Sequence, residues 1–424
     1  MKLKKLHYLL TTTLLLSSAS FASSYNIADD AKLDFAMDAY VRSHVIKPDN
    51  DSSEHGFTSR MRIKANLLLN DGWSIHSRWQ AYYNWAGDRR HSGSPATNFT
   101  DGENNDGLSL DLGFAQYAKD GLLLRAGRQR ADWAYGFNIN NDRRDRLLAM
   151  KSYNFDHGKQ INLIGIYDLR FSESEYDTTA KLDDYYADVS MYALAAMGKI
   201  ERWDWGMLWA YFDGSENNIG NSAIGAGSVG YGIDYFHNIS PFFTGHFNDF
   251  TVKGAMNIIL SDSTEKNGYY TTWGNNGYAG FLETSYQISP AFKLQAQALG
   301  FVDGGLIGRG FDTYSGLINN SNRNDASPIY RQFFGGLGHE DNDGQIIASR
   351  LNWQVSKAWQ LQFAAGHMNI DNYLGTSEDL KASFLDAKSH YQWSKYTDLG
   401  CQISWANEDI DDLAAMFIIN IKYD

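Results

Sequence analysis

The stretch FTSRMRIKANLLL, residues 57–69, alternates between apolar and polar side chains. Successive side chains of a strand point to opposite faces, so Arg60, Arg62 and Lys64 fall on one face and the apolar side chains on the other. A helix would spread the same charges around its whole surface. Asn70-Asp71-Gly72, a hairpin turn signal, follows directly, and WSIHSRWQAYYNW at residues 73–85 alternates in the same way. The sequence therefore predicts a β-hairpin with one polar and one apolar face.

Short turn signals alternate with long polar connections along the rest of the chain. Tight turns are expected at residues 120–121, 156–159, 201–202, 248–249, 289–290, 356–357 and 394–395. Long connections are expected at residues 47–56, 87–107, 172–185, 214–228, 263–276, 303–344 and 371–379. This arrangement is typical of an outer-membrane barrel, whose periplasmic turns are short and whose external loops are longer.

The segments between these connections predict an all-β chain that forms a transmembrane antiparallel β-barrel of eighteen strands. The expected spans are 33–42, 57–69, 73–86, 108–119, 122–130, 146–155, 160–171, 186–199, 203–213, 228–247, 250–262, 277–288, 291–302, 345–355, 358–370, 380–393, 396–407 and 413–423. Sixteen strands is the alternative, because 146–155 alternates poorly and 228–247 is long. The second of these also contains Pro241, which cannot donate to a ladder, so we expect its following turn to differ from Asn248-Asp249.

Composition agrees with a barrel. The 424 residues include 39 Gly but only 5 Pro, and 14% are aromatic. The mean hydropathy is −0.43, which is polar on average, as expected when one face of each strand meets lipid and the other meets water. No run of eighteen apolar residues follows the N-terminus, which argues against helical membrane spans. With 43% hydrophobic and 21% charged residues, the chain is also unlike a disordered protein.

Residues 1–22 have the pattern of a secretory signal peptide, with a lysine-rich start, an apolar run at Leu9–Leu16 and a small-residue cleavage site at Ser20-Phe21-Ala22. The barrel is then expected in residues 23–424. Removing the signal takes away three lysines and no acidic residue, so the net charge changes from −13 to −16. An acidic chain of this kind argues against nucleic acid as a partner.

Two local patterns carry a resemblance to a known family. LRAGRQ at residues 124–129 is similar to the Gly-Arg-Gln strand of outer-membrane porins, and ISPAFKLQ at 288–295 is similar to their repeated turns. The last strand, 413–423, also resembles the closing strand of such proteins. The chain thus resembles eighteen-strand porins, near the substrate-specific and alginate-export families. That resemblance implies the outer membrane of a Gram-negative bacterium, contact with lipid and lipopolysaccharide, and either a homotrimer or a monomer.

Catalytic and metal-binding signatures are sparse. The chain has no Gly-x-Ser-x-Gly and no His-Glu-x-x-His motif, so an enzyme is not expected. Acidic clusters such as Asp49-Asn50-Asp51 lack the spacing of a twelve-residue calcium loop. Cys401 is the only cysteine and lies in an alternating row, which indicates packing. The sequence therefore predicts no cofactor and no metal site.

Basic residues on the polar faces form the candidate site. A Lys or Arg facing lipid at the midplane costs about 2–4 kcal/mol, so these side chains are expected to point into the lumen. Residues 131–145 follow the fifth strand, where the connection in porins commonly folds inward and narrows the pore. The alternative is that the arginines of this segment only neutralise Asp132, Asp142 and Asp145 and hold it to the wall. The candidate residues are Arg60, Arg62, Lys64, Arg78, Arg125, Arg128, Arg130, Arg143, Arg144 and Arg146.

These features predict a diffusion channel for small hydrophilic solutes, with a preference for anions or carboxylates set by the arginines. Two other functions stay open. Export of an acidic polysaccharide follows from the alginate-export resemblance and the row of arginines. A structural or adhesive surface barrel would use its long external loops, above all 303–344, to bind a partner and plug the lumen.

Overall fold

The computed structural model describes residues 23–48, 53–84, 108–156, 159–171, 189–214, 235–261, 276–303, 305, 307–318, 329, 337, 343–371 and 379–423. The expected signal peptide lies outside these residues. Within them, no helix is long and apolar enough to cross a membrane.

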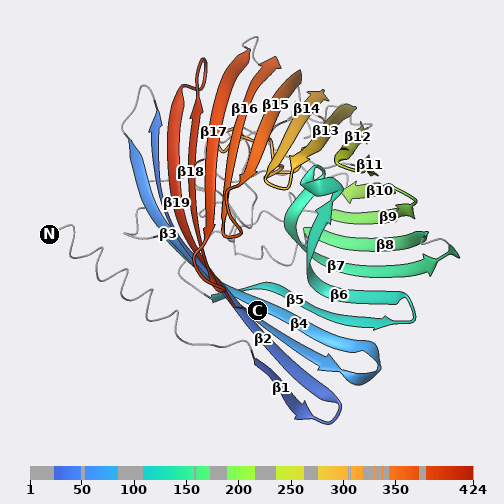
Figure 1. Ribbon diagram of the computed structural model, residues 1–424. Coiled ribbons are helices and arrows are strands. Elements are labelled where there is room, and N and C mark those ends of the chain that lie inside the picture. The colour runs from blue at the N-terminus through green and yellow to red at the C-terminus, as the bar shows by residue number, and fades with distance from the viewer. Residues whose placement is uncertain are drawn as a thin grey trace, which may run out of the picture.

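The chain forms one antiparallel sheet in which strands β2 to β19 close a ring of eighteen (Figure 1). The strands are β1 Ser23–Ala28, β2 Ala31–Pro48, β3 Glu54–Leu69, β4 Trp73–Asn84, β5 Leu108–Lys119, β6 Leu122–Trp133, β7 Ile139–Asn154, β8 Gln160–Phe171, β9 Val189–Ile200, β10 Trp203–Gly214, β11 Tyr235–Phe247, β12 Phe250–Ser261, β13 Gly277–Ser289, β14 Phe292–Val302, β15 Asp343–Gln354, β16 Trp359–Asp371, β17 Leu380–Gln392, β18 Thr397–Ala406 and β19 Asp412–Tyr423. Each barrel strand pairs with its neighbour in sequence, and β19 pairs with β2 to close the ring. The prediction of eighteen strands is confirmed.

β1 is an additional strand outside the ring, and the sequence analysis did not predict it. On one edge of β2, β19 ends where Tyr423 pairs with Met37, and β1 continues the ladder from Ser23, which pairs with Phe35. The backbone groups of β2 beyond the end of β19 therefore find partners in β1, which matters because an unpaired edge invites association.

The two faces of the barrel differ as the alternation predicts. On β3, Met61 is 40% exposed on the outside, whereas Arg60 is 6% exposed on the inside. Large apolar side chains such as Trp79 and Leu194 continue the outer face around the ring. Such a closed sheet with an apolar outer band is stable in lipid, because every backbone group is paired within the sheet. The chain is therefore a transmembrane β-barrel.

Pro241 lies inside β11, and the expectation that it displaces the following turn is wrong. The turn falls at Asn248-Asp249 as the turn signal indicates, since Phe247 pairs with Phe250. Pro241 pairs with Met207 of β10, but the ladder with β12 passes from Ile239 directly to Phe242. The strand tolerates proline because the ladder that would need its missing N–H is interrupted there.

β6 and β7 leave the barrel wall and form a hairpin that bends into the interior (Figure 1). β6 pairs with β5 only as far as Arg128, but it continues to pair with β7 up to Trp133. Gly127, with φ +118°, marks the bend, and a Cβ there would lie 2.4 Å from the carbonyl oxygen of Gly113. Only glycine fits this conformation and this close approach. A short 3-10 turn, η3 Ala134–Gly136, connects the two strands. Most of the expected connection 131–145 is thus regular hairpin.

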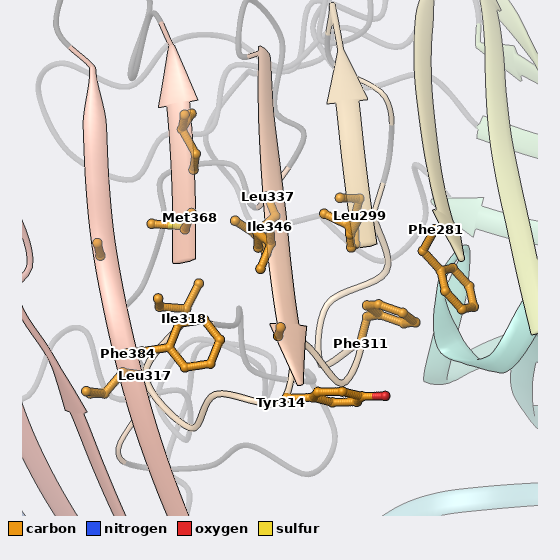
Figure 2. Packing of buried hydrophobic residues seen from close by; sticks show 14 of the residues in the cluster. Phe281, Leu299, Phe311, Tyr314, Leu317, Ile318, Leu337, Ile346, Met368 and Phe384 are labelled. Carbon is orange, nitrogen blue, oxygen red and sulfur yellow. The ribbon is translucent and has the colours of Figure 1, made fainter. Parts of the chain in front are cut away.

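A second segment, residues 307–318, also lies inside the barrel; we call it the insert. Phe311, Leu317 and Ile318 pack against the inner face of β13 to β17, where Met368 and Phe384 are buried (Figure 2). Ile329 and Leu337 belong to the same buried cluster. The sequence analysis placed this segment in the external loop 303–344, and only its alternative of a structural or adhesive barrel had that loop enter the lumen.

Candidate pore-lining site

The inner face of β2 and β3 holds two arginines against one aromatic ring. The guanidinium carbons of Arg42 and Arg60 lie 4.3 and 4.4 Å from the centre of the Tyr40 ring. Arg42 also donates hydrogen bonds to Thr58 Oγ1 at 3.1 Å and to the Tyr82 hydroxyl at 3.4 Å. Cation–π contacts of this geometry are favourable and restrict where the charge can lie. The guanidinium groups of Arg42 and Arg60 are therefore held in place on the inner wall by largely buried side chains.

Asp38 on the same face is shared between two arginines. Arg62 Nε donates to Asp38 Oδ1 at 2.7 Å, and Arg60 Nη2 lies 3.8 Å from the same oxygen. Lys64, one position further along the inner face of β3, forms no ion pair with any described residue. Asp38 therefore serves two arginines at once, and Lys64 adds a further positive charge to the described part of this wall.

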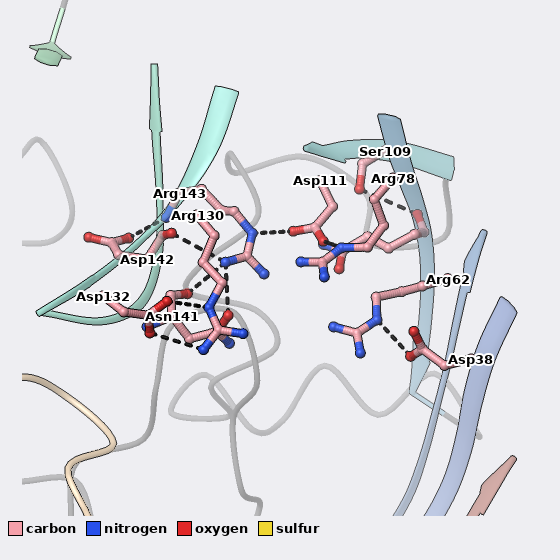
Figure 3. A network of polar contacts seen from close by, with 11 residues as sticks. Asp38, Arg62, Arg78, Ser109, Asp111, Arg130, Asp132, Asn141, Asp142 and Arg143 are labelled. Carbon is pink, nitrogen blue, oxygen red and sulfur yellow. Dashed lines mark hydrogen bonds and ion pairs between the residues drawn. The ribbon is translucent and has the colours of Figure 1, made fainter. Parts of the chain in front are cut away.

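Asp111 connects the barrel wall to the hairpin (Figure 3). Its two carboxylate oxygens accept from Arg78 Nε of β4 and from Arg143 Nε of β7, the latter at 2.6 Å. A β-bulge lies at this point, because Arg78 pairs with Leu112 while the next residue of β4 pairs with Leu110. Asp111 is only 3% exposed, so its two arginines replace water around the carboxylate.

The other hairpin arginines are neutralised locally, as the alternative interpretation expected. Arg128 pairs with Asp145 at 3.2 Å, Arg130 with Asp132, and Arg144 with Asp142. Arg146 makes a bidentate contact with Asp168 of β8, with both N···O distances at 2.7 Å. Asp168 is fully buried, so this pair fastens the base of the hairpin to the neighbouring wall strand.

Arg125 lies apart from these ion pairs, nearer the short-turn end. Its Nε donates to Gln116 Oε1 at 2.7 Å, and its guanidinium group lies 5.3 Å from the centre of the Phe114 ring. Phe114 in turn stacks on His76 at 4.8 Å. Neutral groups hold this arginine, so its charge is not cancelled by a described carboxylate.

The hairpin tip reaches the opposite wall. Trp133 Nε1 donates to the carbonyl oxygen of Ser240 on β11 at 2.8 Å, and Asn257 Nδ2 of β12 donates to the carbonyl oxygen of Phe137 at 3.2 Å. The same Phe137 oxygen accepts from Gly308 N of the insert at 2.6 Å. The hairpin and the insert therefore contact each other, and the hairpin spans the interior from Asp111, beside Arg78, to β11 and β12.

Polar contacts also fix the insert. Arg350 of β15 lies 3.9 Å from the centre of the Tyr314 ring and pairs with Asp312 at 2.6 Å. Burial, together with the nearby Glu283 carboxylate, raises the pKa of the Tyr314 phenol well above its ordinary value, so the ring stays neutral. The backbone N–H of Gly316 donates to Asp386 at 2.7 Å.

Arg42, Asp111 and Arg350 contribute to the site but were not among the residues predicted from the sequence. The sequence could have identified Arg42, because alternation within the expected strand 33–42 puts it on the same face as Tyr40. It could also have identified Asp111, which follows the outward-facing Leu110 and therefore points inward. For Arg350, alternation places it on the inner face of its strand, but nothing local indicates the insert that it contacts. Across the described ranges, no group of three or more His, Cys, Asp or Glu side chains is arranged to hold a metal ion.

Solved structures with the same architecture include OccK9 (OpdG) of Pseudomonas aeruginosa and OccAB3 of Acinetobacter baumannii. OccK9 is 12% identical, with 92% of this chain and 98% of that chain covered and a TM-score of 0.59. This chain has the porin fold. OccAB3 is 10% identical, with 92% and 99% covered and a TM-score of 0.57, and a variant of OccD1 (OprD) is 11% identical, with 95% and 99% covered and a TM-score of 0.56.

These identities establish the fold alone. The resemblance to substrate-specific porins is confirmed at that level, whereas the alginate-export comparison stays a prediction. No protein-family model matches the chain, and no curated protein matches it in sequence.

Proposed function

We propose that this porin-fold barrel is a diffusion channel for small hydrophilic solutes and that it prefers anions, above all carboxylates. The observation that carries the proposal is the excess of positive charge on the inner face of β2 to β6. The basic residues there are Arg42, Arg60, Arg62, Lys64, Arg78 and Arg125, and the described carboxylates that pair with them are Asp38 and Asp111.

A carboxylate solute would exchange its hydration for these guanidinium groups in succession. The planar guanidinium binds a carboxylate through two parallel N–H donors, which a point charge cannot do. A charge pair 4 Å apart is worth about 1 kcal/mol in water and about 4 kcal/mol at an effective dielectric constant of 20. Interactions of this size, spread over several positions, favour entry without trapping the solute.

The hairpin segment 131–145 supports the proposal as a narrowing element, because it runs inward from Asp111, beside Arg78, toward β11 and β12. Its own arginines are mostly neutralised by Asp132, Asp142 and Asp145. In this proposal the basic residues of the wall, rather than those of the hairpin, attract the solute. Arg143 acts mainly by fastening the hairpin to Asp111.

The test is the reversal potential of the purified protein in a planar bilayer under a KCl gradient. Replacing Arg60, Arg62 and Arg78 together by Glu should shift the potential toward cation selectivity, and more at low salt than at high, because salt screens charges over about 8 Å at physiological strength. Arg202→Glu is the matched control, since Arg202 lies in a tight turn and contacts Phe247. A native channel that is already strongly cation-selective, or an unshifted triple variant, would refute the preference.

A structural or adhesive barrel is the second candidate, and the insert favours it, because residues 307–318 occupy interior space against β13 to β17. Conductance separates the two functions: a plugged barrel passes no current. Export of an acidic polysaccharide is tested in the same bilayer, where oligouronates should block the current and neutral sugars should not.

A further inference from the structure

An apolar groove of about 490 Å³ lies on the outer face of the barrel, across β5 to β8. Its floor consists of small residues that neighbour one another through the strand register: Ala115 is opposite Ala126, and Ala149 is opposite Gly165. Leu124 borders the floor on one side and Leu147 on the other, and both are exposed. The groove therefore faces the lipid and is separate from the lumen.

Open space above the floor is a second, independent observation. A Cβ built on Gly165 would meet nothing within 4 Å, unlike one on Gly198 of the next strand, which would lie 2.1 Å from the Gln160 carbonyl oxygen. Neither a tight contact nor a left-handed backbone conformation therefore requires glycine at position 165. Glycine weakens a strand, so its presence there keeps a hollow open at some cost in stability.

Two lysines stand at the short-turn end of this groove. Leu122 of β6 pairs with Lys119 of β5 on one side and with Lys151 of β7 on the other. Each lysine lies two residues from an outward-facing residue of its own strand, Tyr117 or Ala149, so both lysines also point outward. Lys119 Nζ lies 3.5 Å from Asp71 in an exposed pair, and Lys151 Nζ donates to the Asp120 carbonyl oxygen at 3.0 Å. Both ammonium groups retain donors for another anion.

Aromatic rings at the same level indicate where the membrane interface lies. Trp73, the first residue of β4, contacts Tyr117 with ring centres 5.1 Å apart, and both line the groove. Trp and Tyr favour the headgroup level of a membrane. The lysine end therefore lies at the headgroups of the periplasmic leaflet, and the apolar floor extends into its hydrocarbon.

We propose that this groove binds an anionic phospholipid of the periplasmic leaflet, with one acyl chain over Ala149 and Gly165 and the phosphate between Lys119 and Lys151. A flexible apolar chain joined to an anionic head matches both ends of the groove. A second copy of this chain would have to supply an apolar ridge and an acidic group in the same register. The site is on the outer face, so it stands whether or not the lumen conducts.

The experiment is native mass spectrometry of the purified barrel released from micelles that contain phosphatidylglycerol or, in a parallel sample, phosphatidylcholine. The unaltered chain should retain phosphatidylglycerol at least tenfold better than Ala149→Leu/Gly165→Leu, whose side chains fill the floor. Gly280→Leu is the matched control, because Gly280 also lies between exposed Tyr278 and Leu282 on the outer face and a Cβ there has room, with its nearest neighbour at 3.6 Å.

Lys119→Gln/Lys151→Gln should abolish the preference for phosphatidylglycerol over phosphatidylcholine. This variant changes only side chains at the edge of the groove. It therefore still tests the proposal if Ala149→Leu/Gly165→Leu does not fold. Equal retention by all variants would overturn the proposal. A filled groove that dissociates copies of the chain while phosphatidylglycerol stays bound would also overturn it, because the groove would then be a protein interface. All variants should keep the native reversal potential, which separates this result from a failure of the channel proposal.

Discussion

The inner wall has two halves that share one sheet but differ in what covers them. From β2 to β6 the inward residues are mostly Arg, Asp and neutral polar side chains, anchored by contacts such as Arg42 to Tyr40. From β13 to β17 they include Phe281, Ile346 and Phe384, which are buried under the insert. The first half can face water, whereas the second buries an apolar cluster beside polar anchors of the insert such as Arg350 and Asp386.

This difference shows that the inner face of a barrel is not polar by rule. Where the insert packs on it, the inner face carries an apolar cluster together with buried polar groups such as Gln297 and Asp386 that bond to the insert. Apolar burial contributes about 25 cal/mol per Å², so a segment with several large apolar side chains is held inside the barrel as firmly as in a soluble domain. In the proposed channel, the hairpin and the insert would confine the polar path to the arginine side.

The largest expected effect comes from breaking the apolar half. Phe384 is 1% exposed and faces the insert, and its neighbour Leu385 is 55% exposed and faces lipid. Phe384→Ala should lower the free energy of unfolding by about 3–5 kcal/mol, because it leaves a cavity as well as losing burial. Leu385→Ala should cost about 1–2 kcal/mol, the transfer contribution alone. Urea unfolding in lipid vesicles measures both, and equal losses would mean that the insert does not pack on this wall.

A middle-sized effect is expected from the ion pairs that join the hairpin to the polar half. Asp111→Asn removes the carboxylate shared by Arg78 and Arg143, so the free energy of unfolding should fall by about 2 kcal/mol, the range for hydrogen bonds to charged groups. Asp379→Asn breaks an exposed pair with Lys381 and should cost less than about 1 kcal/mol.

Asp111→Asn should also make the native channel more anion-selective, because two positive charges lose their counter-charge. The reversal potential in a KCl gradient measures this change. A shift toward cations would show that the released hairpin, rather than the wall charge, controls selectivity.

The smallest effect on stability is expected on the polar half. Lys64 has no ion-pair partner among the described residues, so Lys64→Gln should change the free energy of unfolding by less than about 0.5 kcal/mol. The anion preference should nevertheless weaken, and Lys64→Arg should retain it. A loss of stability with unchanged selectivity would instead assign Lys64 a structural role.

Much of the barrel was predictable from local periodicity. Alternation over residues 57–69 and the turn at Asn70-Asp71-Gly72 define β3, its register with β4 and the inward direction of Arg60 and Arg62. These properties depend on neighbours within about ten residues, and a strand has a period of two whatever surrounds it. The strand count and the two faces follow for the same reason.

Tertiary structure alone decided what fills the interior. Trp133 reaches Ser240 and Asn140 donates to Gly310, contacts that span more than a hundred residues and exist only once the ring has closed. Residues 307–318 lie in a long connection between two strands, and their apolar side chains acquire a partner only from five wall strands together. Pro241 reads as a strand breaker, yet a gap in a single ladder accommodates it. Local pattern determines which way each side chain points, but closure of the sheet determines what it meets there.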